Sequence, residues 1–147
     1  MTEVEAAREK GAGTGPRVSA VLDASAVLAM LRGEPGAEVV ADAIADRAAM
    51  STVTHAEIGA VLIRNQLDPQ LLARVAAQVL VEPFDLTDAT TAAALVAATA
   101  PLGLSLGDRA CLALARRLGV PAVTAGRSWA QLEVGIEIVL IRHNDPS

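Results

Sequence analysis

Residues 104–129, LSLGDRACLALARRLGVPAVTAGRSW, contain the pattern that decides the fold of this chain. Apolar residues recur at helical spacing up to Gly119, which predicts a helix over 107–118 with a glycine stop. The apolar run 121–124 predicts a short strand, followed by a loop. Asp108 therefore begins a helix that leads into a strand, and the same succession can be sought elsewhere in the chain.

Apolar runs and helix-forming segments alternate over most of the sequence. Further strands are predicted at 18–22, 49–52, 81–85 and 136–141, and further helices at 24–32, 36–48, 54–65, 68–80, 87–99 and 127–133, with Thr87-Asp88 as the cap of the helix at 87–99. This alternation predicts an α/β domain with a central parallel sheet covered by helices on both faces. We place the domain at 18–142, between a disordered N-terminal extension (1–17) and a polar tail (143–147).

The composition excludes several classes of protein. With 147 residues, 52% of them hydrophobic, and a net charge of −5, the chain can form one core but lacks an overall positive charge for nucleic acid. Lys10 is the only lysine, which excludes a P-loop and Schiff-base chemistry. Cys111 is the only cysteine, and His55 and His143 are far apart, so neither a zinc site nor a Ser–His–Asp triad is expected. No apolar run reaches the ~20 residues of a membrane span, and the single cysteine favours a reducing cytoplasmic location.

Three carboxylates follow the predicted junctions of strands and helices. Asp23 ends the first strand, Glu57 is one turn into a helix, and Asp108 begins another. Open parallel sheets bind ligands at the carboxyl ends of their strands, so these acids are candidates for one shared site. Carboxylate oxygens suit Mg²⁺ or Mn²⁺, which can activate water and neutralise charge on a phosphodiester. Arg109, next to Asp108, could balance its charge or contact a phosphate.

Each acid also has a simpler interpretation. Asp23 could only cap the helix that follows it, and Glu57 could only complement the positive end of its own helix. Asp108 could also complement a helix end. Ser105 or Gly107 could provide the N-cap there, which would leave the Asp108 carboxylate available as a ligand.

Three stretches of the sequence resemble the PIN-domain ribonucleases. They are VLDASAVLAMLRGEPG (21–36), STVTHAEIGAVL (51–62) and LSLGDRACLALARRLGVPAVTAGRSWAQL (104–132). Their order and spacing are most similar to the VapC-type toxins of bacterial VapBC toxin–antitoxin modules, over residues 18–142. The resemblance implies a Rossmann-like three-layer α/β/α sandwich and hydrolysis of RNA that depends on Mg²⁺ or Mn²⁺.

The resemblance also implies roles for individual residues. Asp23, Glu57 and Asp108 match three family acids that hold the metal and take part in catalysis. Ser25 matches a small polar residue that supports the first acid.

One position departs from the family pattern. A fourth acid commonly follows the Thr-Ala pair, which is Thr124-Ala125 here, but this chain has Gly126, while Trp129 keeps the frame. Thr124 is expected to support the site. The missing carboxylate predicts weaker metal binding and reduced ribonuclease activity, because a second metal or an oriented water would lose a ligand.

The resemblance implies RNA as the substrate and a small VapB-type antitoxin as the partner, with a basic side chain that enters the acidic pocket. It also implies a homodimer or a toxin–antitoxin hetero-oligomer, without a membrane. Two alternatives stay open. Gly126 favours a non-catalytic PIN-like module that binds RNA or the antitoxin. A phosphatase with Asp23 as its nucleophile would need a second Asp where Ser25 stands.

Overall fold

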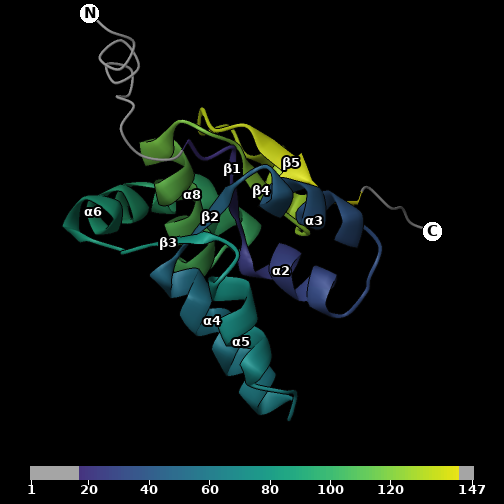
Figure 1. Cartoon of the computed structure of the whole chain (residues 1–147). Coiled ribbons are helices and arrows are strands. Elements are labelled where there is room, and N and C mark those ends of the chain that lie inside the picture. The colour runs from purple at the N-terminus through teal and green to yellow at the C-terminus, as the bar shows by residue number, and fades with distance from the viewer. Residues whose placement is uncertain (1–16, 143–147) are drawn as a thin grey trace, which may run out of the picture.

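The computed structural model describes residues 17–142, which Figure 1 shows as a sheet enclosed by helices. The polar tail and most of the predicted N-terminal extension, residues 143–147 and 1–16, lie outside the described residues. None of the helices within 17–142 is long and apolar enough to cross a membrane.

Within residues 17–142, five parallel strands form the sheet, in the order β3-β2-β1-β4-β5. They are β1 (Ala20–Leu22), β2 (Ala48–Ser51), β3 (Leu80–Glu82), β4 (Ala122–Thr124) and β5 (Ile138–Leu140). The chain adds β2 and β3 on one side of β1 and then returns to add β4 on the other side. The winding therefore reverses between β1 and β4, and such a switch point is where open parallel sheets bind ligands. The predicted α/β fold with a central parallel sheet is confirmed.

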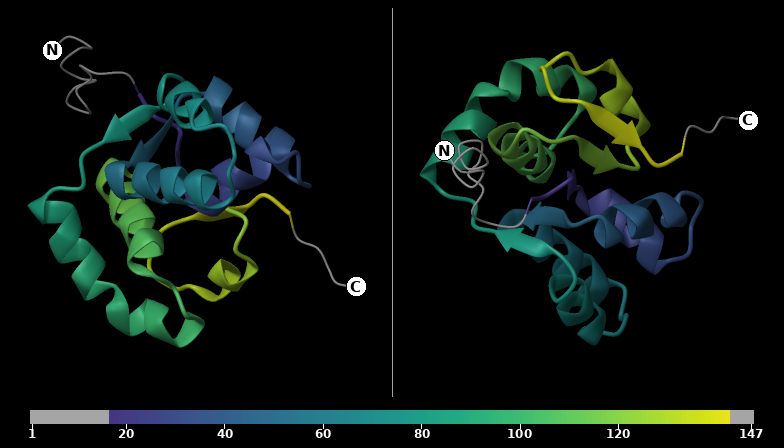
Figure 2. Two further views of the ribbon diagram at one scale, coloured as in Figure 1. Left: turned by 90° about the horizontal axis from the view of Figure 1, so that it is seen from below. Right: turned by 45° about the horizontal axis from the view of Figure 1, so that its top comes forward.

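Helices cover both faces of this sheet (Figures 1 and 2). Their bounds are α2 (Ala24–Leu31), α3 (Ala37–Ala45), α4 (Thr52–Arg64), α5 (Gln70–Ala76), α6 (Leu86–Ala94), α7 (Val96–Thr99), η1 (Ala100–Leu102), α8 (Leu106–Leu118) and η2 (Arg127–Gln131). Side chains from α2, α3, α4 and α5 form one apolar core with the sheet. Side chains from α8 and η2 form a second core on the opposite face.

Strand residues alternate between these two cores, because successive side chains of a strand point to opposite faces. In β1, Leu22 joins the core of α2–α5, whereas Val21 joins the core of α8. In β2, Met50 joins the core of α2–α5, whereas Ala49 joins the core of α8. All four side chains are fully buried. Burial on both faces explains why the strands appear in the sequence as continuous apolar runs.

The start of α6 differs from the prediction. Asp85 is the N-cap, and its Oδ1 accepts from the Asp88 N–H at 3.0 Å, so the prediction of Thr87-Asp88 as the cap is wrong. The buried Asp88 carboxylate instead accepts from Arg117 of α8, at 2.8 Å on Oδ1 and 3.1 Å on Oδ2. The partner of Asp88 comes from a distant part of the sequence, and local pattern cannot reveal it.

Candidate functional site

Asp23 and Thr124 lie side by side at the switch point of the sheet. Leu22 of β1 is in register with Val123 of β4, so the residues that follow them reach the same edge. The Thr124 hydroxyl donates to Asp23 Oδ2 at 3.0 Å. The structure thereby joins the first predicted acid to a predicted supporting residue from the far end of the chain.

Ser25 completes a hydrogen-bond network around the same oxygen. Its hydroxyl donates to Asp23 Oδ2 at 2.6 Å and accepts from the Ala125 N–H at 3.0 Å. The Gly126 N–H donates to Thr124 Oγ1 at 3.0 Å. Two backbone N–H groups therefore polarise two hydroxyls that donate to one carboxylate oxygen. This network fixes the orientation of Asp23 through Oδ2.

The other oxygen of Asp23, Oδ1, is a buried acceptor without a hydrogen-bond partner in residues 17–142. Asp23 is only 2% exposed. Burial raises the pKa of its carboxyl from 3.8 to about 6, hydrogen bonds from Ser25 and Thr124 oppose the rise, and the charge of Asp108 adds to it. A buried carboxylate without a partner is costly, so Oδ1 requires a proton or a cation. This oxygen therefore fits a metal ligand.

Asp108 is held at the start of α8 by a capping box. Ser105 Oγ accepts from the Asp108 N–H at 3.2 Å, and Asp108 Oδ2 accepts from the Ser105 N–H at 2.8 Å. The expectation that a Ser105 cap leaves the Asp108 carboxylate available is wrong for one of its two oxygens, because the cap is reciprocal. Asp108 can still offer Oδ1 to a metal without breaking the cap.

Glu57 projects from α4 onto the first turn of α8. A Cβ atom added to Gly107 would overlap all three atoms of the Glu57 carboxylate, so the carboxylate lies directly against the Gly107 backbone. Burial raises the pKa of Glu57, and the charges of Asp23 and Asp108 raise it further. The three predicted acids therefore interact electrostatically although they belong to different segments.

The charges of the three acids also act on Cys111. This side chain is fully buried in α8 and belongs to the apolar core. Burial raises its pKa well above the usual value, and the charges of Asp23, Asp108 and Glu57 each raise it further. The three carboxylates thus lie around the same part of α8.

The three carboxylates do not form a closed metal cage as they stand. Among the described residues, no three His, Cys, Asp or Glu side chains are grouped closely enough to hold one ion. Asp108 is bonded to Ser105, and Glu57 rests on Gly107. Asp23 is therefore the acid whose orientation is fixed in advance, and an ion shared by all three would require Glu57 or Asp108 to turn toward it.

Two further residues near the acids were not predicted to belong to the site. Gly107 provides the space that the Glu57 carboxylate occupies. Thr54 of α4 is fully buried, and its hydroxyl has no partner in the part of the chain that the structure describes. Thr54 precedes Glu57 by three positions, so the two side chains share one face of the helix. This spacing is the one clue to Thr54 in the sequence.

The Arg109 side chain is engaged in a contact with the backbone of α6. Its Nη1 donates to the Ala92 carbonyl of α6 at 3.0 Å. The guanidinium therefore braces α8 against α6, and a contact between Arg109 and a substrate phosphate stays a prediction.

The position of the missing fourth acid is partly filled by an aromatic ring. A Cβ atom at Gly126 would lie 2.9 Å from Trp129 Cδ1 and 3.0 Å from its Nε1. Trp129 is 3% exposed and packs in the core of α8. A side chain at position 126 would therefore require a shift of the indole.

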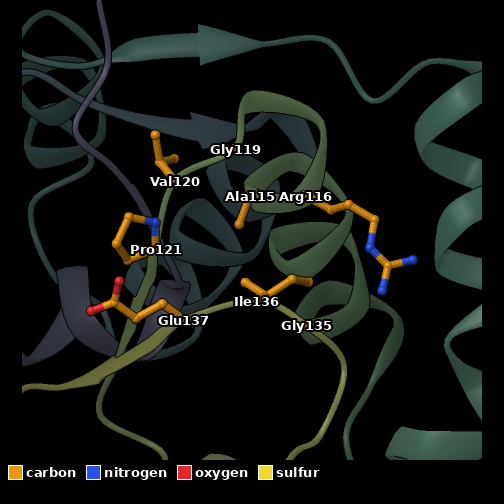
Figure 3. A pocket seen from close by; sticks show the side chains of 8 residues that line it. All are labelled: Ala115, Arg116, Gly119, Val120, Pro121, Gly135, Ile136 and Glu137. Carbon is orange, nitrogen blue, oxygen red and sulfur yellow. The ribbon is translucent and has the colours of Figure 1, made fainter.

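A surface pocket of about 210 Å³ lies at the opposite edge of the sheet (Figure 3). Its lining includes Pro121 and Glu137, which precede β4 and β5, whereas the candidate acids follow or flank the strand ends at the other edge. Figure 3 shows Arg116 extending away from Glu137, and the Arg116 guanidinium donates to the Val134 carbonyl at 2.8 Å. The pocket does not bring the charges of Arg116 and Glu137 together. The cluster of Asp23, Glu57 and Asp108 is therefore the better candidate for the functional site.

Residues 20–135 of the chain match the family described as "PIN domain". The match spans most of the sequence, and the chain belongs to the PIN-domain family. No curated protein matches the sequence.

Solved structures with a similar fold include toxins of toxin–antitoxin systems. A toxin–antitoxin complex from Klebsiella pneumoniae matches with a TM-score of 0.69 and 18% identity, over 86% of this chain and 100% of that chain. DNA-bound VapBC from Salmonella typhimurium matches with a TM-score of 0.64 and 18% identity, over 84% of this chain and 98% of that chain. VapC20 from Mycobacterium tuberculosis is described as a sarcin–ricin loop cleaving toxin. It matches with a TM-score of 0.63 and 19% identity, over 81% of this chain and 99% of that chain. At these identities the likeness establishes a shared VapC-type fold.

Proposed function

We propose that the protein is a divalent-metal-dependent endoribonuclease and the toxin of a VapBC-type pair. The observation that carries the proposal is the buried, unpartnered Oδ1 of Asp23 at the switch point, in electrostatic interaction with Glu57 and Asp108. Proteins of the PIN-domain family, to which the chain belongs, are typically metal-dependent ribonucleases. A donor set made only of carboxylate oxygens suits Mg²⁺ or Mn²⁺.

The acids have different tasks in this proposal. Asp23 would hold the metal through Oδ1, because Ser25 and Thr124 already fix Oδ2. Asp108 would add its Oδ1 while its capping box keeps the start of α8 in place. A bound Mg²⁺ would supply an activated water and neutralise charge on the phosphodiester. Glu57, whose pKa is raised by burial and by the charges of Asp23 and Asp108, would serve as a proton acceptor beside these two acids.

The acidic cluster also suits a cationic side chain of an antitoxin. Three carboxylates attract an Arg or Lys for the same electrostatic reason that they attract a divalent ion. One similar structure is a toxin–antitoxin complex, and the similar VapBC structures from Salmonella typhimurium and Rickettsia felis are bound to DNA. We therefore propose a small VapB-type partner, within a homodimer or hetero-oligomer.

A second candidate function is a non-catalytic PIN-like module that binds RNA or the antitoxin. Gly126 and the indole of Trp129 beside it favour this alternative, because a fourth carboxylate is missing where one is common in the family. Both candidates use the same fold and the same three acids. A measurement of cleavage is needed to separate them.

Purified protein is expected to cleave RNA internally in the presence of Mn²⁺ or Mg²⁺, and EDTA is expected to stop the reaction. The substrate panel should include a sarcin–ricin loop oligonucleotide, tRNA and total RNA. Asp23→Asn should lower the rate at least about 100-fold, because even residues behind metal ligands affect activity by 10–100-fold. Cleavage that survives Asp23→Asn would come from a contaminating ribonuclease. Mn²⁺ binding without cleavage by the wild type would support the non-catalytic module.

Gly126→Asp is expected to raise the affinity for Mn²⁺ by about tenfold and to increase RNA cleavage, since it adds a carboxylate beside Thr124. The backbone at Gly126 has φ −79°, which any residue adopts, so the cost is the shift of the Trp129 ring. Calorimetric titration with Mn²⁺ measures the change. Gly126→Asn is the matched control, because it imposes the same steric cost without the charge. Equal affinities for the Asp and Asn variants would contradict this interpretation of the loop.

A further inference from the structure

The contact between Gly107 and Glu57 joins two helices that are distant in sequence. Gly107 is buried in the first turn of α8, between the N-cap Ser105 and Asp108. The Glu57 carboxylate of α4 occupies the space in which any other residue at position 107 would place its Cβ. The overlap involves Cδ and both oxygens, so the whole carboxylate depends on this space.

Backbone conformation does not explain a glycine at this position. Gly107 is not among the residues with positive φ, so an L-amino acid fits its backbone. The space required by the Glu57 carboxylate is the physical reason that the structure offers for Gly107.

The contact also decides where the Glu57 charge lies. Asp108 is the next residue after Gly107, and its carboxylate is fixed by the capping box. A carboxylate packed on Gly107 is therefore close to Asp108 and to the positive end of α8. Any side chain at position 107 would displace the Glu57 carboxylate from this place beside Asp108.

We propose that Gly107 is a positioning residue for the acidic cluster, because its missing side chain seats the Glu57 carboxylate against the first turn of α8. This inference rests on the proposed metal-dependent function for its consequence, which is the retention of Glu57 near Asp23 and Asp108. The seat itself is a property of the protein without metal. It can therefore be tested separately from catalysis.

The first test uses metal-free protein. The ¹³C resonance of the Glu57 side-chain carboxyl, assigned by its loss in Glu57→Ala, is expected to move in Gly107→Ala. The resonance of Glu82, which lies in a separate ion pair with Arg117, should stay in place. A helical far-UV circular dichroism spectrum confirms that the variant is folded. An unchanged Glu57 resonance in the folded Gly107→Ala variant would overturn the proposal.

The second test measures Mn²⁺ affinity in two backgrounds. Gly107→Ala is expected to weaken binding by about tenfold when Glu57 is present, and to have no effect in the Glu57→Ala background. An equal loss in both backgrounds would show that Gly107 acts without Glu57, and would overturn the proposal. If the wild type binds no Mn²⁺, the proposed function fails, and the carboxyl resonance alone decides the role of Gly107.

Discussion

Asp23→Asn is expected to raise the free energy of unfolding of the metal-free protein by up to about 3 kcal/mol at pH 7, although it removes the central residue of the proposed site. The pKa of Asp23 lies near 6 in the folded protein rather than at 3.8. Each pKa unit corresponds to about 1.4 kcal/mol, so ionised Asp23 destabilises the fold by about 3 kcal/mol at neutral pH. The neutral amide of Asn avoids this cost and can still accept hydrogen bonds from Ser25 and Thr124. Urea denaturation in EDTA measures the difference.

The matched control is Asp88→Asn, the same substitution at a second buried aspartate. Asp88 is 1% exposed and Asp23 is 2% exposed, so burial is equal. Asp88 accepts two hydrogen bonds from Arg117, whereas Asp23 Oδ1 has no partner within 17–142. Asp88→Asn should therefore lower the stability, by about 2 kcal/mol, because it weakens charge-assisted hydrogen bonds. A loss of stability in both variants would show that the Asp23 carboxylate is already satisfied without metal.

Stability of the metal-free protein is expected to fall by about 3 kcal/mol between pH 4 and pH 6–7 because of Asp23. A carboxyl group with a raised folded-state pKa binds its proton more tightly in the folded protein. Its contribution to stability is fully present below pH 3.8 and is lost as the pH rises through about 6. Glu57, whose pKa is also raised, acts in the same direction. Unfolding curves in EDTA at several pH values, compared with those of Asp23→Asn, isolate this contribution.

Divalent metal should reverse this trend. Metal binding needs the deprotonated carboxylate, so the affinity for Mn²⁺ should rise about tenfold per pH unit below pH 6 and level off above it. Excess Mg²⁺ or Mn²⁺ should then stabilise the wild type at pH 7, and leave Asp23→Asn unchanged. A wild-type pH profile that coincides with that of Asp23→Asn in EDTA would contradict the raised pKa. Equal stabilisation of both proteins by Mn²⁺ would place the metal elsewhere.

Local pattern was sufficient for most of the secondary structure. The glycine stop at Gly119 and the helix before it agree with the sequence, because a helix end depends on residues within about one turn. The strands were recognisable as apolar runs because both of their faces are buried. The cap of α6 was wrongly predicted, although the contact that defines it, from the Asp88 N–H to Asp85, spans only three residues. The partner of the Asp88 side chain, Arg117, belongs to another helix and could not be read from local pattern.

The candidate site was only partly predictable. The sequence indicated the three acids and Ser25, but it did not reveal that Oδ2 of Asp23 is occupied and Oδ1 is not. The seat of Glu57 on Gly107 was also hidden, because it depends on how α4 packs against α8. Which oxygen of a carboxylate is available follows from contacts between segments.

By itself, the sequence determined the α/β class, the positions of Asp23 and Asp108 at helix starts and of Glu57 within a helix, and the glycine at 126. Periodicity, caps and turns act over a few neighbouring residues, so they can be recognised along the chain. Only the tertiary structure decided the order β3-β2-β1-β4-β5, which places Thr124 beside Asp23 and the three acids around one part of α8. That order follows from the burial of apolar faces between distant segments, and it leaves Asp23 with one oxygen held by hydrogen bonds and the other without a partner in residues 17–142.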